Sequence, residues 1–251
     1  MDRAYFINYY HLEREHWWFK VRSEIIINHC TQLLQGVKNP KILNIGVATG
    51  YLSEKLMALG EVESIEFDQT CYEFTKNLNK IKIVQGSILQ LPFEDNVFDL
   101  VCAFDVIEHV NDDQKAIFEM NRVSRTAGKL IVTVPAFRSL WSSHDEINHH
   151  FRRYTQKQLI SLVGEDNIVF CSYFNSILFI PVYLLKKIQN LISVFHKSGK
   201  PLNSNFDVIR SSLVNQVLEK IFRLEINPLK KQSTLPFGIS LICSSRKLKH
   251  L

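Results

Sequence analysis

The sequence predicts a doubly wound α/β fold with a mostly parallel sheet, and three observations support this class. Short apolar runs alternate with amphipathic segments of helical length over residues 41–134. Such alternation produces right-handed parallel units with helices on both faces of the sheet. The chain has 251 residues, 46% of them hydrophobic, which suffices for one well-filled core. The five cysteines include no C-x-x-C pair and are expected to pack as small hydrophobic side chains.

The expected elements follow in order along the chain. Residues 2–34 are predicted to be helical, and Gly36 and Pro40 end this segment. Strands are expected at residues 41–45, 62–67, 81–84, 98–104, 129–134, 167–173 and 238–244. Helices are expected at residues 51–59, 70–78, 112–124, 155–163, 177–195 and 208–222. A polar and aromatic loop is expected at 136–154, and a Gly- and Pro-containing connection at 196–205.

Charge is unevenly distributed along the chain, whose net charge is +5. Residues 152–251 carry fifteen basic and five acidic side chains, whereas residues 1–151 carry fifteen basic and twenty acidic ones. Either the basic part is a solvated surface or it contacts an anionic partner. The apolar run at 168–185 is too short and too interrupted for a membrane span, and no signal peptide is expected. A cytoplasmic location is therefore predicted.

The first predicted strand leads into a turn of small residues. Gly46, Ala48 and Gly50 lie in this turn, directly before a predicted helix. The arrangement brings backbone N–H groups close to a ligand, and alanine at the second position of the dinucleotide fingerprint favours a ligand without phosphates. Glu66 follows twenty residues after Gly46, where a carboxylate accepts hydrogen bonds from ribose hydroxyls. The alternative is an ordinary β–α turn with an exposed glutamate.

These residues resemble the class I S-adenosylmethionine-dependent methyltransferases over most of the chain. Residues 42–51 look like the first motif of that superfamily, with Asn44 in place of a common aspartate. Residues 85–93 look like its adenine-binding turn, and residues 98–110 look like its fourth strand and the segment after it. The resemblance implies a Rossmann-like, seven-stranded, mostly parallel sheet with an antiparallel final strand. It also implies S-adenosyl-L-methionine as the cofactor.

A set of cofactor-binding residues follows from these motifs. The set is Arg22, Gly46, Ala48, Gly50, Glu66, Phe67, Gly86, Ser87, Ile88, Phe104 and Asp105. Arg22 is expected to pair with the cofactor carboxylate, and Phe67 to lie along the adenine ring. Ser87 stands where the superfamily often has an aspartate that binds the adenine amino group. The aromatic stretch at residues 17–19 forms either a lid over the cofactor or part of the core.

A closer resemblance is to a subgroup of bacterial polysaccharide- and lipid-modifying methyltransferases. It rests on residues 16–19, 140–146, 152–155 and 173–175. It implies methyl transfer, first of all to oxygen, on a small-molecule or lipid-linked acceptor. Nucleic acid is not expected as a partner, because Asn-Pro-Pro-Tyr and Pro-Cys motifs are missing at the relevant strand ends. The oligomeric state is left open.

A hydroxyl acceptor needs a general base, and the candidates follow the fifth strand. His144, followed by Asp145, is the predicted catalytic pair, with His149 and His150 as further candidates. The alternative is that these histidines are polar surface residues or order the loop.

A possible metal motif precedes this loop. Asp105, Glu108 and His109 have the spacing of one helical face, and the pattern resembles a divalent-metal site in ubiquinone-pathway O-methyltransferases. The favoured interpretation is that no metal binds.

Two other classes of function remain open. One is a non-catalytic module that binds an adenosyl ligand. The other is a peripheral membrane adaptor, in which an apolar helix at 177–195 and surrounding lysines, Lys247 among them, would contact anionic lipid. In each case we expect one domain, with a helical lid at 1–36, a cofactor-binding core at 37–135 and an acceptor side at 136–251.

Overall fold

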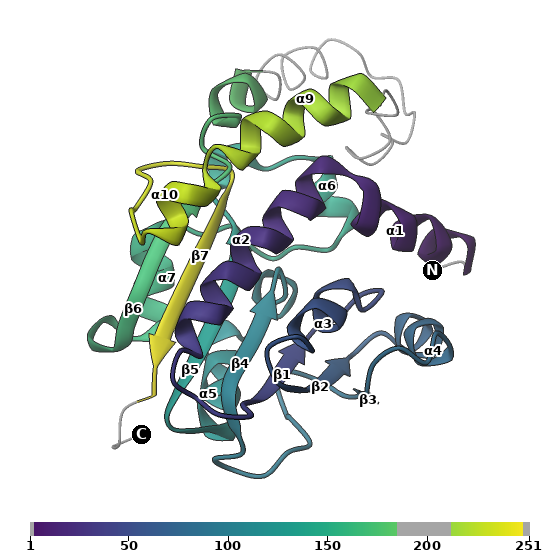
Figure 1. Ribbon diagram of the computed structural model, residues 1–251, viewed down its shortest axis with the longest axis vertical. Coiled ribbons are helices and arrows are strands. Elements are labelled where there is room, and N and C mark those ends of the chain that lie inside the picture. Colours follow the sequence, from purple (N-terminus) through teal and green to yellow (C-terminus); the bar gives the residue numbers. More distant parts are fainter. Residues whose placement is uncertain (1–2, 185–211, 248–251) are drawn as a thin grey trace.

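The computed structural model describes residues 3–184 and 212–247, which contain one seven-stranded sheet in the order β3-β2-β1-β4-β5-β7-β6 (Figure 1). The strands are β1 (Lys41–Ile45), β2 (Glu61–Glu66), β3 (Ile83–Gln85), β4 (Phe98–Phe104), β5 (Ser124–Pro135), β6 (Ile168–Phe174) and β7 (Ser240–Arg246). The first five strands pair in parallel, and β7 runs antiparallel to both β5 and β6. The predicted fold class, including the antiparallel final strand, is confirmed.

Helices occupy most of the predicted positions. They are α1 (Arg3–Glu15), α2 (Trp17–Leu33), α3 (Tyr51–Leu56), α4 (Gln69–Asn77), α5 (Asp113–Val123), α6 (Ser143–Ile147), α7 (Gln156–Val163), α9 (Ser212–Arg223) and α10 (Ile226–Lys230). The N-terminal helix is interrupted at His16, whose extended backbone and side chain cap a second helix. The predicted connection at 196–205, and most of the helix predicted at 177–195, lie outside the described residues.

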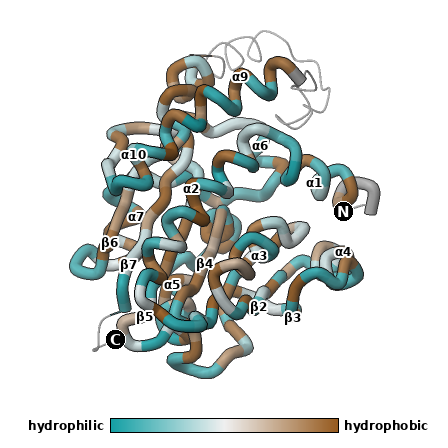
Figure 2. Tube along the Cα trace, viewed as in Figure 1, coloured by the Kyte–Doolittle hydropathy of each residue, from teal (hydrophilic) through white to brown (hydrophobic). Residues whose placement is uncertain are grey.

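Helices cover both faces of the sheet and bury its central strands, whereas β3 at the edge stays partly exposed. Because strand side chains alternate between faces, Leu43 packs into one core with α5 and α7, and Ile42 packs into the other with α2, α9 and α10. Figure 1 shows α2 in front of the sheet and α5 and α7 behind it. Figure 2 shows hydrophobic and hydrophilic residues alternating along the helices, whereas β4 and β6 are mostly hydrophobic. A ligand can therefore bind only at the ends of the central strands, beyond the helices that pack on the sheet.

The strand order identifies one such end as a natural binding position. β1 lies between β2 and β4, so the connections leaving β1 and β4 run to opposite sides of the sheet. Crevices of doubly wound folds form at such a switch point, outside the carboxyl ends of the strands. Gly46 and Asp105 follow β1 and β4 directly, and Gly46 packs there against Val106.

The segment after β4 differs from the prediction. Asp105 has a positive φ of 57°, and a three-residue 3-10 helix, η1 (Ile107–His109), follows it. The expectation that Asp105, Glu108 and His109 share one face of an α-helix is therefore wrong. The left-handed backbone at Asp105 prevents helical continuation, and the next helix begins only after the Asp112 cap.

The predicted loop at 136–154 contains short helices. The 3-10 helix η2 (Arg138–Leu140) precedes α6, and a further one, η3 (Glu165–Asn167), precedes β6. Ser142 and Asp145 form a reciprocal capping box at the start of α6. Thr155 caps α7 as predicted, also in a capping box. Five residues are too few for α6 to show a helical period in the sequence.

Helix α1 packs against the turn that follows β1. The Glu13 carboxylate is buried and accepts a hydrogen bond from the Thr49 hydroxyl. Arg14 beside it bonds the Thr49 oxygen and the Glu54 carboxylate. Burial raises the pKa of Glu13 to about 7, although the Thr49 hydrogen bond and the charge of Arg14 oppose this shift. Docking of α1 on the turn is thus linked to the protonation of Glu13.

The raised pKa of Glu13 predicts that stability depends on pH. Between the ordinary pKa of about 4.5 and the raised value of about 7, the folded state holds a proton that the unfolded state releases. Unfolding free energy should therefore fall as pH rises through this window. Glu13→Gln cannot ionise, so we expect it to exceed the natural protein in stability by up to about 3 kcal/mol at pH 8, and to match it near pH 5.

Urea denaturation at pH 5 and pH 8 measures this difference. Glu15→Gln, at an exposed position of the same helix, is the matched control and should show no such pH-dependent gain. Equal gains for Glu13→Gln at both pH values would contradict the assignment.

Candidate active site

The turn after β1 adopts the strained backbone that its small residues permit. Gly46, Ala48 and Gly50 all have positive φ, at 69°, 48° and 86°. A Cβ atom on Gly46 would lie 2.4 Å from Val106 Cγ2, so glycine lets this turn pack directly against the end of β4. Gly50 serves as the N-cap of α3 and directs the helix N-terminus toward the turn.

Glu66 lies at the end of β2 beside this turn. Its Oε2 accepts a hydrogen bond from Ala48 N (3.2 Å), and its Oε1 accepts from Phe67 N and Asp68 N (2.9 and 3.0 Å). Burial raises the pKa of Glu66, although these backbone N–H groups stabilise the ionised form. The predicted neighbourhood of the glycine turn and the carboxylate is present. The alternative of an exposed glutamate is wrong, because Glu66 is 9% exposed.

Two further elements of the predicted site lie next to Glu66. Phe67 is 74% exposed, which is unusual for a phenylalanine with a core packing role. Gly86 N donates to the Glu66 carbonyl oxygen (2.9 Å), so the turn after β3 lies beside the end of β2. Within that turn Ile88 is buried, and the Ser87 hydroxyl accepts from Leu89 N.

Arg22, a residue of α2, extends to the ends of β4 and β5, on the other side of β1 from Glu66. Its guanidinium is buried and pairs with Asp105 Oδ2 at 2.8 Å, and it also donates to Thr133 Oγ1 at 3.0 Å. The Trp18 ring lies 5.1 Å from the guanidinium carbon. Phe104, directly before Asp105, is buried in the core. Arg22 thus lies at the carboxyl ends of the strands, and its ion pair with Asp105 could not be anticipated from spacing.

The N-terminal aromatic residues divide between two environments. Trp17 and Phe19 are buried, and Trp17 packs edge-to-face on Phe222 of α9. Asn215 of α9 accepts a hydrogen bond from the Trp17 backbone. Only Trp18 lies beside Arg22, so the core interpretation fits Trp17 and Phe19 better than a lid.

Asp145 organises the segment that follows β5. It is completely buried and accepts from His150 Nδ1 (2.9 Å) and from Arg153 Nε and Nη2 (2.7 and 3.0 Å). Ser142 N also donates to it at 2.8 Å. Burial alone would raise the pKa of Asp145, but the hydrogen bonds from His150 and Arg153 outweigh burial and hold the pKa well below its ordinary value.

These bonds change the predicted pairing of His144 with Asp145. Both carboxylate oxygens of Asp145 are occupied, and the histidine that it orients is His150. The His144 ring lies nearby, with its centroid 6.2 Å from that of His150. His149 is exposed. The sequence reasoning missed Arg153 as the counter-ion, because a paired arginine and a surface arginine look alike in a sequence.

Glu108 and His109 meet this segment from η1. The Glu108 backbone oxygen accepts from Phe151 N (2.8 Å), and His109 Nδ1 lies 2.8 Å from the Asn148 oxygen. The rings of His109 and His150 stand edge-to-face, with centroids 4.5 Å apart. Burial, reinforced by the charge of Asp105, raises the pKa of Glu108 well above its ordinary value. Desolvation by surrounding atoms and the neighbouring His150 lower the pKa of His109 to about 4.

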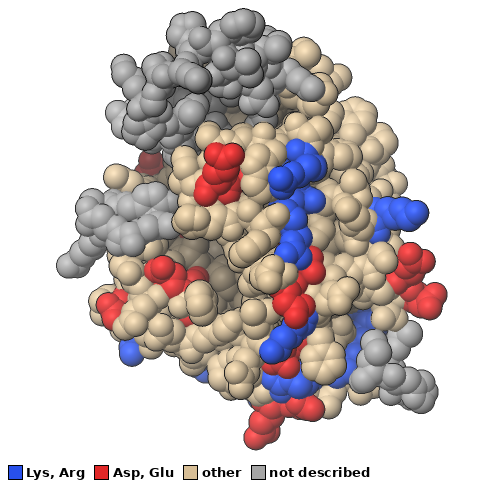
Figure 3. All heavy atoms as spheres, turned by 180° about the vertical axis from the view of Figure 1, so that it is seen from behind, with Lys and Arg blue, Asp and Glu red and all other residues tan. Residues whose placement is uncertain are grey.

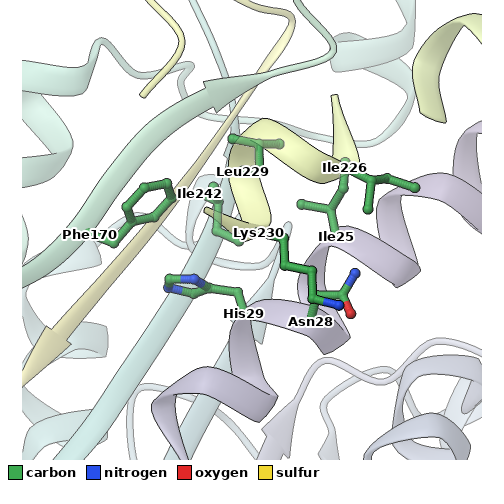
Figure 4. A pocket seen from close by; sticks show the side chains of 8 residues that line it. All are labelled: Ile25, Asn28, His29, Phe170, Ile226, Leu229, Lys230 and Ile242. Carbon is green, nitrogen blue, oxygen red and sulfur yellow. The ribbon is translucent and has the colours of Figure 1, made fainter. Parts of the chain in front are cut away.

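A separate small cavity lies away from these residues (Figure 4). Its volume is about 10 Å³, and His29, Phe170 and Lys230 are among the residues that line it. This is room for one water molecule at most. No residue of the predicted cofactor set lines it, so it is a packing defect between α2, α10 and the β6–β7 edge.

The described surface does not carry a continuous basic patch on the face drawn in Figure 3, where basic and acidic side chains alternate along a narrow band. Lys247, expected to face a membrane, is 7% exposed, and its Nζ donates to the Asn96 side chain and the Ser124 carbonyl oxygen. That part of the membrane prediction is therefore wrong. Among the described residues, no helix is long and apolar enough to cross a bilayer.

Comparisons with known proteins agree with this geometry. Residues 43–132 match a family model described as a methyltransferase domain. Demethylmenaquinone methyltransferase of Staphylococcus aureus is 32% identical over 119 residues, which cover 42% of this chain and 49% of that protein. The chain thus spans about half the length of the curated relatives it matches.

Solved structures extend the likeness to nearly the whole chain. An S-adenosylmethionine-dependent methyltransferase from Thermotoga maritima has a TM-score of 0.58 at 16% identity, covering 96% of this chain and 95% of that one. Haemonchus contortus phosphoethanolamine N-methyltransferase 2, solved in complex with S-adenosyl-L-methionine, has a TM-score of 0.54 at 13% identity, covering 88% of this chain and 52% of that one. At such identities these structures share the fold alone. The match to a methyltransferase domain covers residues 43–132, which include the glycine turn, β2, β3 and β4.

Proposed function

We propose that this chain transfers a methyl group from S-adenosyl-L-methionine to an oxygen of a small-molecule or lipid-linked acceptor. The observation that carries the proposal is the junction of three parts at the sheet's switch point. Glu66, the positive-φ turn and the exposed Phe67 lie together there, held by the hydrogen bonds of the Glu66 carboxylate. This set offers acceptors to a ribose, open backbone to a ligand and an aromatic face to adenine, with no phosphate-binding glycine pattern.

The remaining cofactor residues are proposed to surround these three. Gly86, Ser87 and Ile88 would border the adenine, because their turn is bonded to Glu66. Arg22 and Asp105 would contact the amino-acid end of the cofactor beyond β4. The guanidinium of Arg22 is positively charged and the carboxylate of Asp105 is negatively charged. The cofactor carboxylate would then share Arg22 with Asp105, and its ammonium group would lie near the Asp105 carboxylate.

The chemical step needs alignment more than a strong catalyst. The acceptor oxygen forms a bond to the methyl carbon while the carbon–sulfur bond breaks, and sulfur keeps the electron pair. Holding the three atoms in line supplies about 7–11 kcal/mol of the barrier. The acceptor proton passes to a base, for which we propose His144. Asp145 is a positioning residue in this scheme, since His150 and Arg153 occupy its carboxylate.

The acceptor is proposed by class. The subgroup resemblance supports a glycan or other lipid-linked hydroxyl compound. The Staphylococcus relative is named for demethylmenaquinone, so a quinone is a second compound to test. Isothermal titration with S-adenosyl-L-methionine and its demethylated product, against a nicotinamide dinucleotide, tests the cofactor first. Binding of the adenosyl ligands without turnover on any acceptor class would favour a non-catalytic module.

Glu66→Ala should weaken S-adenosyl-L-methionine binding by at least about tenfold. The variant loses charge-assisted hydrogen bonds to the ribose, each of which contributes about 1.5–3 kcal/mol, and it frees the Ala48 N–H group. Calorimetric titration measures the change. Glu73→Ala, an exposed acid on neighbouring α4, should bind as the natural protein does. Unchanged affinity in folded Glu66→Ala would remove Glu66 from the site.

Phe67→Ala tests the proposed adenine contact with little risk to folding, because the ring is largely exposed. Loss of stacking on a base costs about 1–3 kcal/mol, so the dissociation constant should rise by about 5- to 150-fold. Phe118→Ala is a matched control, since that ring is 66% exposed on α5. If the two variants bind S-adenosyl-L-methionine equally well, Phe67 does not contact the adenine.

A further inference from the structure

Three potential metal ligands from two separate segments meet beyond the carboxyl end of β4. Each of Glu108, His109 and His150 offers one ligand atom, and these atoms all lie within 4.8 Å of one another. Glu108 and His109 come from η1, whereas His150 comes from the segment after α6. Backbone and side-chain hydrogen bonds to Phe151 and Asn148 hold the two segments together. Glu108 and His109 were part of the metal motif noted in the sequence, whereas His150 joins them only through the tertiary structure.

The contacts of Glu108 with the described residues do not explain why a carboxylate is buried at this position. Its side chain is completely buried, and neither carboxylate oxygen has a hydrogen-bond partner among them. A buried carboxylate without partners is costly, and it is relieved either by a proton or by a cation. Arg22 and Arg153, the nearby cations, are already paired with Asp105 and Asp145.

Hydrogen bonds at Nδ1 leave Nε2 of both histidines available as a metal ligand. His150 Nδ1 lies 2.9 Å from Asp145 Oδ1, and His109 Nδ1 lies 2.8 Å from the Asn148 carbonyl oxygen. Because an ionised carboxylate and a carbonyl only accept hydrogen bonds, each Nδ1 must be the donor. The lone pair then lies on Nε2 of each neutral ring. Histidine ligands of metal ions are oriented in this same way by a carboxylate or carbonyl behind them.

Asp105 does not belong to the group, although its spacing suggested it. Its carboxylate is bonded to Arg22 and to the Thr133 hydroxyl, which turns it toward α2 and β5. The third ligand position is filled instead by His150, about forty residues further along the chain.

We propose that Glu108, His109 and His150 bind one divalent transition-metal ion. Two imidazole nitrogens and one carboxylate oxygen suit Zn²⁺, Mn²⁺ or Fe²⁺ better than Mg²⁺ or Ca²⁺, which prefer oxygen ligands alone. With bonds of about 2.0–2.2 Å, a tetrahedral ion draws its ligand atoms to about 3.4 Å from each other, so binding contracts the group. Three protein ligands leave a coordination position open.

The role of the ion rests on the proposed function, whereas its binding does not. Asp105, proposed at the cofactor's amino-acid end, and Glu108 both lie in the segment after β4, so the ion would lie on the same edge of the sheet as the proposed cofactor site. A metal-bound hydroxyl loses its proton more readily than a free one. The ion would thus bind and acidify the acceptor oxygen, and His144 would take the proton.

The test is metal binding by the full chain, free of any histidine tag and previously dialysed against a chelator. ZnCl2 and MnCl2 are titrated calorimetrically without S-adenosyl-L-methionine, and retained metal is counted after gel filtration. We expect one equivalent per chain for at least one of the two metals. Glu108→Gln and His109→Gln should each raise the dissociation constant by at least about 100-fold. Circular dichroism checks that each variant is folded.

His149→Asn is the matched control, because it removes the adjacent exposed histidine and asparagine tolerates the positive φ of 54° there. It should retain the full equivalent. No binding by the natural chain, equal binding by the two ligand variants, or equal loss in His149→Asn overturns the proposal. Titrating S-adenosyl-L-methionine separately in the presence of chelator distinguishes its failure from failure of the proposed function.

Discussion

Coverage of the central strands by helices on both faces is the constraint on which the rest of the structure depends. Residues on both faces of β1 and β4 are fully buried, so neither face can bind a ligand. Polar chemistry is confined to the carboxyl ends of the strands, where the backbone leaves the sheet. Every residue of the proposed sites that carries charge lies there, or on α2 or the segment after β5, which extend over that edge.

Charged groups at this edge are arranged in pairs that neutralise one another. Arg22 is matched by Asp105, and Arg153 is matched by Asp145, each within about 3 Å. Buried pairs of this kind are weak sources of stability but strong determinants of geometry, because removing one partner leaves an uncompensated charge. The first pair fixes α2 against the end of β4, and the second fixes the conformation of the segment after β5. Glu108 stands out because the described residues provide no such partner for it.

Features that depend on residues close together in the sequence could be predicted from it. The strands, the glycine turn and the position of Glu66 follow from periodicity and from spacing within one β–α–β unit, and they agree with the structure. Pairings across the fold could not be predicted in this way. His150 rather than His144 bonds Asp145, because α6 and the turn after it change the direction of the chain. A helix of five residues is too short to be predicted from the periodicity of its sequence. Likewise, the left-handed Asp105 separates it from Glu108 and His109, which helical spacing would have kept together.

The place of β7 in the sheet has a consequence for biosynthesis. β7 lies between β5 and β6, and β6 has no other partner strand in the described sheet. During synthesis β6 therefore emerges from the ribosome about seventy residues before β7, its partner in the described sheet. Unpaired strands with apolar side chains readily associate with other chains, so the nascent protein is exposed to aggregation until β7 inserts. Long-range closure of this kind also makes folding slow compared with that of proteins of local topology.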